Sequence, residues 1–295
     1  MFTVLWPMSA NPNLAPPIEL LKAKKPGMSR AQKLLFFFTA WLICLMPFLF
    51  WWNTWFGRKL SDLQLTEYLH DAKKPRHIQQ ALVQVGERIT RQEATAKRWY
   101  PDLVRLAADP VEEVRNTDAW VMGQDASFAA FHQALLNLLA DPSPMVRGNA
   151  ALSLVRFGDA TGRAQIVALL QPAQITSPQA GRIVDSDRPG TAIHQGGLIA
   201  KLEYGTKQIA EIRSPIPGRI RSVAGTGANL SAGAELAVVD PANEQVWEAL
   251  RALYLIGQPD DLAAIRPYER DLADISNDVR QQAAETERAI QQRAK

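Results

Sequence analysis

Residues 175–203 read ITSPQAGRIVDSDRPGTAIHQGGLIAKLE, and residues 212–240 read IRSPIPGRIRSVAGTGANLSAGAELAVVD. The two segments align without a gap at an offset of 37 residues. Neither copy can bury the apolar faces of its strands by itself, so we expect the copies to pair about a pseudo-twofold axis. The glycines mark tight turns, and the Ser-Pro steps mark extended entries to strands. The shared residues are Ile175, Ser177, Pro178, Gly181, Arg182, Ile183, Gly190, Gly196 and Ala200, which recur as Ile212, Ser214, Pro215, Gly218, Arg219, Ile220, Gly227, Gly233 and Ala237.

This doubled Ser-Pro-x-x-Gly-x-Ile motif resembles the barrel-sandwich hybrid of biotinyl and lipoyl carrier domains. The same fold is used in the periplasmic adaptor (membrane fusion) proteins of efflux and secretion systems. The resemblance implies an all-β module over residues 173–241. In the adaptors a long α-helical hairpin separates the halves, whereas here the link is Tyr204–Glu211, which is too short for one.

The resemblance also singles out Lys207, which lies eight residues before Pro215 and eleven before Gly218. Carrier domains place their modified lysine in a hairpin at this spacing. Thr206 and Gln208 flank it here, whereas lipoyl domains have Asp before the lysine and biotinyl domains have Met beside it. Lys207 is therefore the candidate attachment site for lipoate or biotin, and the alternative is a solvated turn residue.

A second repeat lies upstream, at an offset of 32 residues. Asp109-Pro110 and Val114-Arg115 recur as Asp141-Pro142 and Val146-Arg147. Asp is suited to cap a helix, and Pro is suited to its first turn. The pattern resembles the HEAT repeat family, in which stacked helix pairs form a solenoid. Weaker copies are Leu65, Tyr68, Asp71 and Ala81 before it, and Ala249, Leu253, Ile256, Gly257, Asp274, Val279, Arg280 and Ala284 after it.

The segment from Leu34 to Phe56 holds 23 residues without a charge, enough to cross a bilayer as a helix. Residues 1–33 carry a net charge of +4, from Lys22, Lys24, Lys25, Arg30 and Lys33 against Glu19. This bias predicts a cytoplasmic N-terminus, with everything after Phe56 outside the inner membrane. A cleaved signal peptide is disfavoured because the charged region before the apolar stretch is too long.

The predicted fold class is therefore multidomain α and β. It comprises a single transmembrane helix and a HEAT-like α-solenoid with an inserted all-β barrel-sandwich hybrid. The predicted segments are a cytoplasmic tail (1–33), a transmembrane helix (34–56), HEAT-like repeats (57–172), the lipoyl-like module (173–241), and further helical repeats that cap the solenoid (242–295).

Composition excludes several chemistries. Cys44 is the one cysteine, so a disulfide framework, a thiolate zinc site and an iron–sulfur cluster are excluded, and we expect no metal. Asp118, Asp125 and His132 fall seven residues apart, which suggests an acid–base constellation or, more simply, a solvated helix face. We expect no catalytic residues. Trp120, with Phe128 and Phe131, is expected in the core between repeats.

These modules together predict a non-enzymatic scaffold or adaptor subunit of a larger envelope complex. Its expected partners are other membrane-complex subunits and the lipid bilayer, with no nucleic acid, because no basic patch interleaved with aromatics follows residue 33. The expected state is an oligomer or hetero-complex without a cofactor. The alternatives are a carrier or accessory enzyme subunit with lipoate or biotin on Lys207, and a sensor that binds a small ligand in the sandwich cleft.

Overall fold

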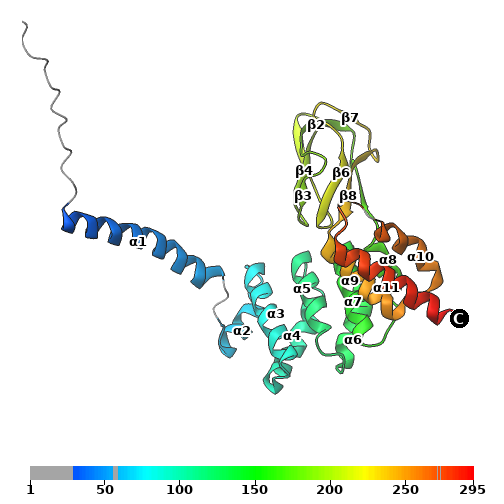
Figure 1. The fold of residues 1–295 in the computed structure, drawn as a ribbon, viewed down its shortest axis with the longest axis horizontal. Coiled ribbons are helices and arrows are strands. Elements are labelled where there is room, and N and C mark those ends of the chain that lie inside the picture. The colour runs from blue at the N-terminus through cyan, green and yellow to red at the C-terminus, as the bar shows by residue number, and fades with distance from the viewer. Residues whose placement is uncertain (1–28, 56–58, 271, 273) are drawn as a thin grey trace, which may run out of the picture. The chain divides into compact units, whose positions relative to one another are not determined.

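The computed structural model describes residues 29–55, 59–270, 272 and 274–295, and the chain divides into two units, Met1–Arg58 and Lys59–Lys295. The first unit contains helix α1 (Arg30–Trp55), and the second contains all the other elements (Figure 1). Most of the predicted tail (1–33), namely residues 1–28, lies outside the described residues. So does Phe56, the last residue of the predicted transmembrane helix.

Helix α1 begins earlier than the apolar stretch predicted. The Ser29 side chain accepts a hydrogen bond from the Gln32 N–H at 3.2 Å, and Gln32 Oε1 accepts one from the Ser29 N–H at 2.9 Å. This reciprocal capping starts the helix at Arg30, so Arg30–Lys33, which we assigned to the tail, belongs to α1. Over Arg30–Phe48 the mean hydropathy is 1.6 and none of the segment is buried, so its length and composition suit a membrane span.

The second unit is a mixture of helices and two antiparallel sheets, as predicted. Its longer helices neighbour one another in the order α3, α5, α7, α9 and α11, with shorter helices joining them (Figure 1). Before the sheets come α2 (Asp62–Leu69), α3 (Pro75–Thr90), η1 (Ala94–Trp99), α4 (Tyr100–Leu106), α5 (Glu112–Met122), α6 (Ala129–Leu138), α7 (Pro144–Arg156) and α8 (Arg163–Ala168). After them come α9 (Asn243–Ile256), η2 (Pro259–Asp261), α10 (Leu262–Ile265), η3 (Arg266–Glu269) and α11 (Asn277–Arg293).

The Asp-Pro and Val-Arg motif fixes the turns before α5 and α7. Arg115 Nη1 donates to the carbonyl oxygens of Asp109 and Pro110, at 2.8 and 3.2 Å. Arg147 makes the same two bonds in its own repeat. Arg115 also reaches the next repeat, where it binds both carboxylate oxygens of Asp141, at 2.7 and 3.0 Å. The motif therefore closes the turn in both repeats, and Arg115 links the first repeat to the second.

Small residues let adjacent helices approach closely. A Cβ on Gly123, which caps the C-terminal end of α5, would overlap the Ser153 side chain of α7. Ser153 itself is buried and donates from its hydroxyl to the Ala119 carbonyl at 2.8 Å. The close contact between α5 and α7 thus depends on glycine at one position and on a small hydrogen-bonding residue at the other.

The strands predicted between residues 175 and 240 are present, and they form two open four-stranded sheets. Neither sheet closes on itself: the strand orders are β1-β8-β6-β3 and β5-β4-β2-β7. The strands are β1 (Ala173–Thr176), β2 (Gly181–Ser186), β3 (Ala192–Ile193), β4 (Leu198–Tyr204), β5 (Gln208–Arg213), β6 (Gly218–Val223), β7 (Asn229–Leu230) and β8 (Glu235–Pro241).

The two sequence copies form equivalent bonds to one another. The Ser177 N–H donates to the Ala234 carbonyl, and the Ser214 N–H donates to the Gly197 carbonyl. Each buried serine hydroxyl also donates to the carbonyl two residues ahead, at 2.7 Å for Ser177 and 2.6 Å for Ser214. Short strand β3 of the first copy pairs with β6 of the second, and β7 pairs with β2 in return. Each copy thus completes the sheet of the other.

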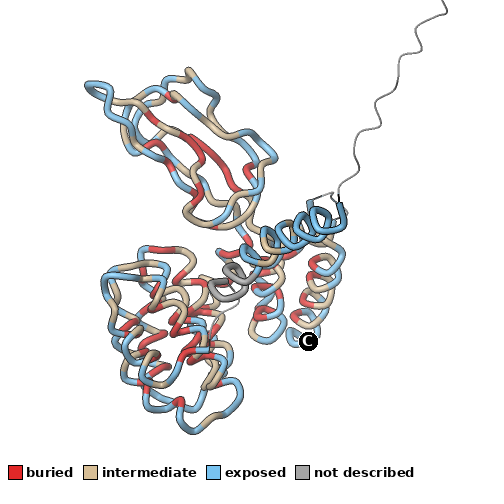
Figure 2. Tube along the Cα trace, turned by 90° about the vertical axis from the view of Figure 1, so that its left-hand side faces the viewer, coloured by how far each residue is buried: buried red, intermediate tan, exposed pale blue. Residues whose placement is uncertain are grey.

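Buried side chains lie between the two sheets, including Ile183, Leu202, Ile220 and Val239. Figure 2 shows these buried stretches running along the inside of the sheet module. Met145 of α7 packs against the same cluster. The module is inserted in the chain between α8 and α9. Its helical neighbours therefore come both from before and from after the insertion.

Candidate functional site

Lys207 lies at the tip of the β4–β5 hairpin. Tyr204 and Gln208 are the last paired residues, which leaves Gly205, Thr206 and Lys207 as the connection. The backbone of Lys207 has a φ of 63°, and that of Gly205 has a φ of 52°. A non-glycine residue in this left-handed region is uncommon and is found mainly in turns.

The Lys207 side chain is exposed, as are those of Thr206 and Gln208. No hydrogen bond or ion pair of its ammonium group is found within the described residues. The hairpin therefore presents a single amine to solvent at the end of two paired strands.

The long helices of the second unit border a groove of about 490 Å³. Its walls come from α5, α7, α9 and α11, and they include Trp120, Asn149, Tyr254 and Leu255. Trp120 has 41% of its surface exposed, so our prediction that it lies in the core between repeats is wrong. Phe131, by contrast, is fully buried, with ring centroids 4.9 Å from Phe128 and 4.6 Å from Tyr100.

Residues 133–160 match the HEAT repeat family model. The match covers most of α6 and all of α7 up to the turn that follows it. The HEAT repeat thus accounts for the helix pair α6–α7, of which α7 borders the groove, and the predicted resemblance is confirmed over that pair.

The other comparisons add little. No curated protein matches the chain. One solved structure, described as a single-chain, multi-domain long-chain acyl-CoA carboxylase, is similar at 19% identity. The similarity covers 46% of this chain and 15% of that one, with a TM-score of 0.23, so it supports no statement about fold or function.

The sequence suggested an acid–base constellation of Asp118, Asp125 and His132. Within the described part of the chain, no hydrogen bond or ion pair joins these three side chains to one another. His132 Nε2 lies 2.8 Å from Asp159 Oδ2. Asp125 accepts hydrogen bonds from the Tyr100 hydroxyl at 2.6 Å and from the Ser127 N–H at 2.9 Å. Burial raises the pKa of Asp125, but these bonds outweigh it and hold the pKa below its usual range. Each of these two side chains has its own structural partner.

Asp118 differs from both because it is fully buried in α5. Neither of its carboxylate oxygens has a hydrogen-bond partner among the described residues. Burial raises the pKa of Asp118 well above its usual range, although Arg105 acts in the opposite direction. The equivalent position in the HEAT repeat is held by Ala150, which is also fully buried. The interpretation of position 118 as a solvated face is therefore wrong.

We expect Asp118→Asn to raise the free energy of unfolding at pH 8 and to leave it nearly unchanged at pH 4. The folded pKa of Asp118 is above the unfolded value of about 3.9, so the stability contributed by the protonated form is fully present below that value. It is lost as pH rises through the folded pKa, at about 1.4 kcal/mol per pH unit. Urea unfolding across this range measures the difference.

The matched control is Asp125→Asn, for which the sign is opposite. The pKa of Asp125 is lowered, so its contribution is present above about pH 4 and is lost as pH falls. An Asp118→Asn profile that runs parallel to wild type from pH 4 to pH 8 would show that the carboxyl group is not protonated on folding.

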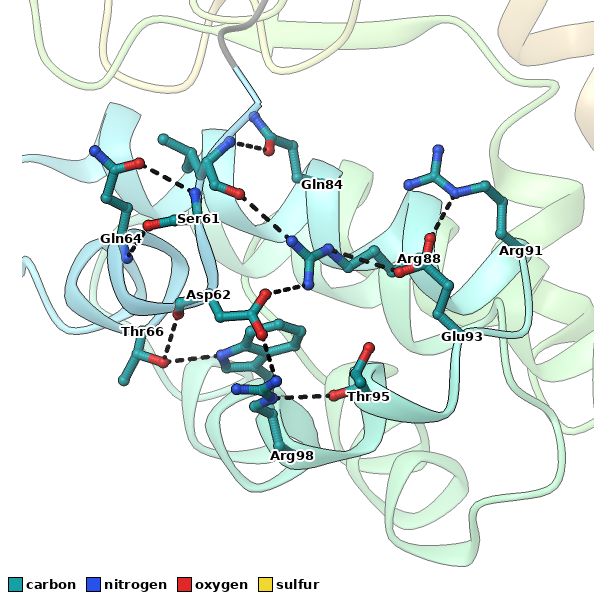
Figure 3. Close-up of polar contacts among 12 residues, drawn as sticks. Ser61, Asp62, Gln64, Thr66, Gln84, Arg88, Arg91, Glu93, Thr95 and Arg98 are labelled. Atoms are coloured by element: carbon teal, nitrogen blue, oxygen red, sulfur yellow. Dashed lines mark hydrogen bonds and ion pairs between the residues drawn. The ribbon is translucent and has the colours of Figure 1, made fainter.

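A further polar cluster was missed by the sequence analysis (Figure 3). Asp62 of α2 accepts hydrogen bonds from Arg88 of α3, at 2.6 Å, and from Arg98 of η1. Both guanidinium groups lie over the buried Trp99 ring, 5.0 and 4.8 Å from its centroid. The hydrogen bond from Arg88 and the charges of both arginines hold the pKa of Asp62 below its usual range, against the effect of burial. The cluster joins three elements at the start of the second unit.

No group of three or more His, Cys, Asp or Glu side chains suited to hold a metal ion is found in the described residues. Lys207 is the one sequence-predicted site residue, and the structure places it at an exposed hairpin tip. The groove and the Asp62 cluster are formed by residues far apart in the chain, and no local motif signals either of them.

Proposed function

We propose that the protein is a membrane-anchored, non-enzymatic scaffold or adaptor subunit of a larger envelope complex. The observation that carries this proposal is helix α1, whose apolar side chains are exposed around the helix. Leu34, Phe37 and Ile43 have 74%, 70% and 67% of their surfaces exposed. Exposed apolar surface on this scale is unfavourable in water and favourable in a bilayer.

Two further features support a scaffold. The helices of the second unit, with the HEAT repeat match over residues 133–160, support a short α-solenoid whose successive pairs expose a continuous groove. The reciprocal strand exchange in the two sheets supports the proposal of a barrel-sandwich hybrid, similar to lipoyl and biotinyl domains. Both architectures serve chiefly to hold and present partners.

For localisation we propose a single-pass inner-membrane protein with a cytoplasmic N-terminus and an external C-terminal part. The basic residues before Leu34 support this orientation. Reporter fusions at both ends test it. An external reporter active at the C-terminus and a cytoplasmic reporter active at the N-terminus are the expected outcome, and the reverse pattern would overturn the orientation.

Alkaline carbonate washing of membranes that contain the full chain tests the anchor. We expect wild type to remain in the membrane pellet. We expect Phe37→Lys combined with Ile43→Lys to reach the soluble fraction, because each lysine near a span's centre costs about 3 kcal/mol. Val83→Lys, at an exposed apolar position of α3, is the control and should remain in the pellet. Release of wild type by carbonate would contradict the anchor.

The scaffold role is tested by extracting the chain in mild detergent and measuring the mass of the native particle. We expect a particle larger than the monomer with other membrane proteins in fixed proportion. Recovery of the monomer at every detergent concentration would count against the proposal.

The exposed position and left-handed backbone of Lys207 favour a second candidate, a carrier subunit with lipoate or biotin attached to this amine. Intact-mass measurement of the purified chain decides between the two. An added mass that disappears in Lys207→Ala supports the carrier, and an unmodified chain supports the scaffold.

A further inference from the structure

We propose that the face formed by α5, α7, α9 and α11 binds an extended segment of a partner protein. The segment places a basic side chain beside Trp247 and an apolar side chain between Trp120 and Tyr254. This inference rests on the scaffold function proposed above and gives the chemistry of its partner.

The apolar part of the surface lies in the 490 Å³ groove. Trp120, Tyr254 and Leu255 line it and have 41%, 43% and 61% of their surfaces exposed. The Trp120 ring rests on one side against Gly86, where an added Cβ would come within 3.2 Å of it. Its indole is therefore held in place and offers its remaining surface to a ligand. Aromatic side chains of this kind contribute most of the energy at protein interfaces.

The acidic part of the surface is a neighbouring pocket of about 360 Å³ that begins at Glu248, which lines both pockets. Glu244, Glu248 and Asp278 contribute three carboxylates, and Trp247 contributes an indole ring. None of the described residues that line this pocket is basic. The pocket therefore complements a cation by charge and, through the indole, by cation–π attraction.

The protein already places a guanidinium group of its own beside the Trp247 ring. Arg251 lies 4.6 Å from the centroid of the Trp247 ring, and its Nη1 is 3.7 Å from Glu248 Oε1. Arg251 and Trp247 are four residues apart on α9, so this pair fixes the indole from one side. The carboxylates of Glu244 and Asp278 have no ion-pair partner within the described residues. They remain available for a basic side chain from outside.

The spacing of the two parts fits an extended peptide. Glu244, Glu248 and Leu255 lie along one stripe of α9, because successive members are four and seven residues apart. From Glu244 to Leu255 the helix rises by about 16 Å at 1.5 Å per residue. An extended chain advances about 3.3 Å per residue, so about five residues cover this length. The basic and apolar residues of the partner should therefore be about three to five positions apart.

One side-chain amide at the groove can bind a peptide backbone. Asn149 lines the groove, and its Nδ2 donates to Asn116 Oδ1 at 2.8 Å, which joins α7 to α5. The Asn149 Oδ1 atom has no partner among the described residues. This oxygen complements one peptide N–H, whatever side chains the peptide carries.

The test uses random peptides displayed on phage and selected against the full chain in lipid nanodiscs. Enriched peptides are synthesised, and their dissociation constants are measured by fluorescence anisotropy. We expect sequences with a Lys or Arg three to five positions from a large apolar residue. We expect Glu248→Lys and Leu255→Ser each to weaken their binding by about tenfold or more. Both positions are exposed, so neither substitution disturbs the core.

The matched control is Glu67→Lys, which makes the same charge change at an exposed position of α2. Its dissociation constants should stay within about twofold of wild type. Equal binding by wild type and Glu248→Lys, or enrichment of acidic peptides, would overturn the proposal. Self-association of the full chain that both groove variants abolish would also overturn it, in favour of a second copy as occupant. The native-particle measurement tests the scaffold separately, because a particle can be larger than the monomer whether or not this groove binds peptides.

Discussion

Gly218→Ala is expected to lower the free energy of unfolding of the second unit by about 3 kcal/mol or more. A Cβ at position 218 would overlap the Asp240 carbonyl oxygen and would lie 2.9 Å from the Asp240 carbonyl carbon. Both atoms belong to the backbone of β8, which pairs with β6 at this point. Relief of the overlap therefore requires separation of two central strands, and side-chain rotation cannot achieve it.

Thermal unfolding followed by circular dichroism measures the effect, and the melting temperature should fall by roughly 10 °C. Gly225→Ala is the control, because an added Cβ there meets nothing within 4 Å and should change the stability by less than about 0.5 kcal/mol. Gly181→Ala should resemble Gly218→Ala, since Gly181 is the equivalent residue of the first sequence copy and its Cβ would lie 2.5 Å from the Glu203 carbonyl oxygen. Equal melting temperatures for Gly218→Ala and Gly225→Ala would show that the strands do not approach this closely.

Asp141→Asn is expected to lower the free energy of unfolding by about 3 kcal/mol at neutral pH. The Asp141 and Arg115 side chains have 5% and 12% of their surfaces exposed, and they bind through two hydrogen bonds. The neutral amide still accepts the hydrogen bond from the Ser143 N–H, so the turn before α7 keeps this bond. What the substitution removes is the charge that balances a largely buried guanidinium group.

Asp109→Asn is the control for this change. Asp109 has the same position in the preceding repeat, and its carboxylate accepts a hydrogen bond from the Val111 N–H at 2.9 Å. Its side chain has no ion-pair partner within the described residues, so we expect a loss of less than about 1 kcal/mol. Urea unfolding of both variants tests the difference. Equal losses would assign the effect to the turn and not to the ion pair.

The pH dependence of wild type supplies a second measurement on Asp141. Burial raises the pKa of Asp141, but the hydrogen bonds from Arg115 and Ser143 outweigh it and hold the pKa below its usual range. The contribution of a group with a lowered pKa is present above the unfolded value of about 3.9. It is lost as pH falls through the folded pKa. The stability difference between wild type and Asp141→Asn should therefore shrink below about pH 4.

Much of the second unit follows from local sequence patterns. The Ser-Pro-x-x-Gly-x-Ile motif predicts strands because its serine and glycine act on neighbouring residues of the same segment. The hydroxyl groups of Ser177 and Ser214, for example, each donate to the carbonyl oxygen two residues ahead. The Asp-Pro and Val-Arg motif predicts helix pairs for the same reason. The pairing of β3 with β6 and of β7 with β2 could not be predicted strand by strand, because it depends on the meeting of the two copies.

The groove and the Asp62 cluster were harder to predict than the fold, because their residues are far apart in the sequence. Asp62 meets Arg88 and Arg98, which lie 26 and 36 residues further along the chain. Trp120 has a helical spacing that fits a core position, yet its exposure depends on how α5 sits between α3 and α7. Asp118 was assigned to a solvated face because it is charged, and its burial reverses that assignment. Lys207 was located correctly at a turn because hairpin tips are set by local sequence.

The sheet module joins the helices through two adjacent strands, since β1 enters it and β8 leaves it, and these strands pair along their length. A force that pulls the module outward loads both roots in the same direction. The load is then divided between two covalent chains, and the hydrogen bonds between them are not sheared. The orientation of the module relative to α8 and α9 is therefore set by two neighbouring chain connections instead of one.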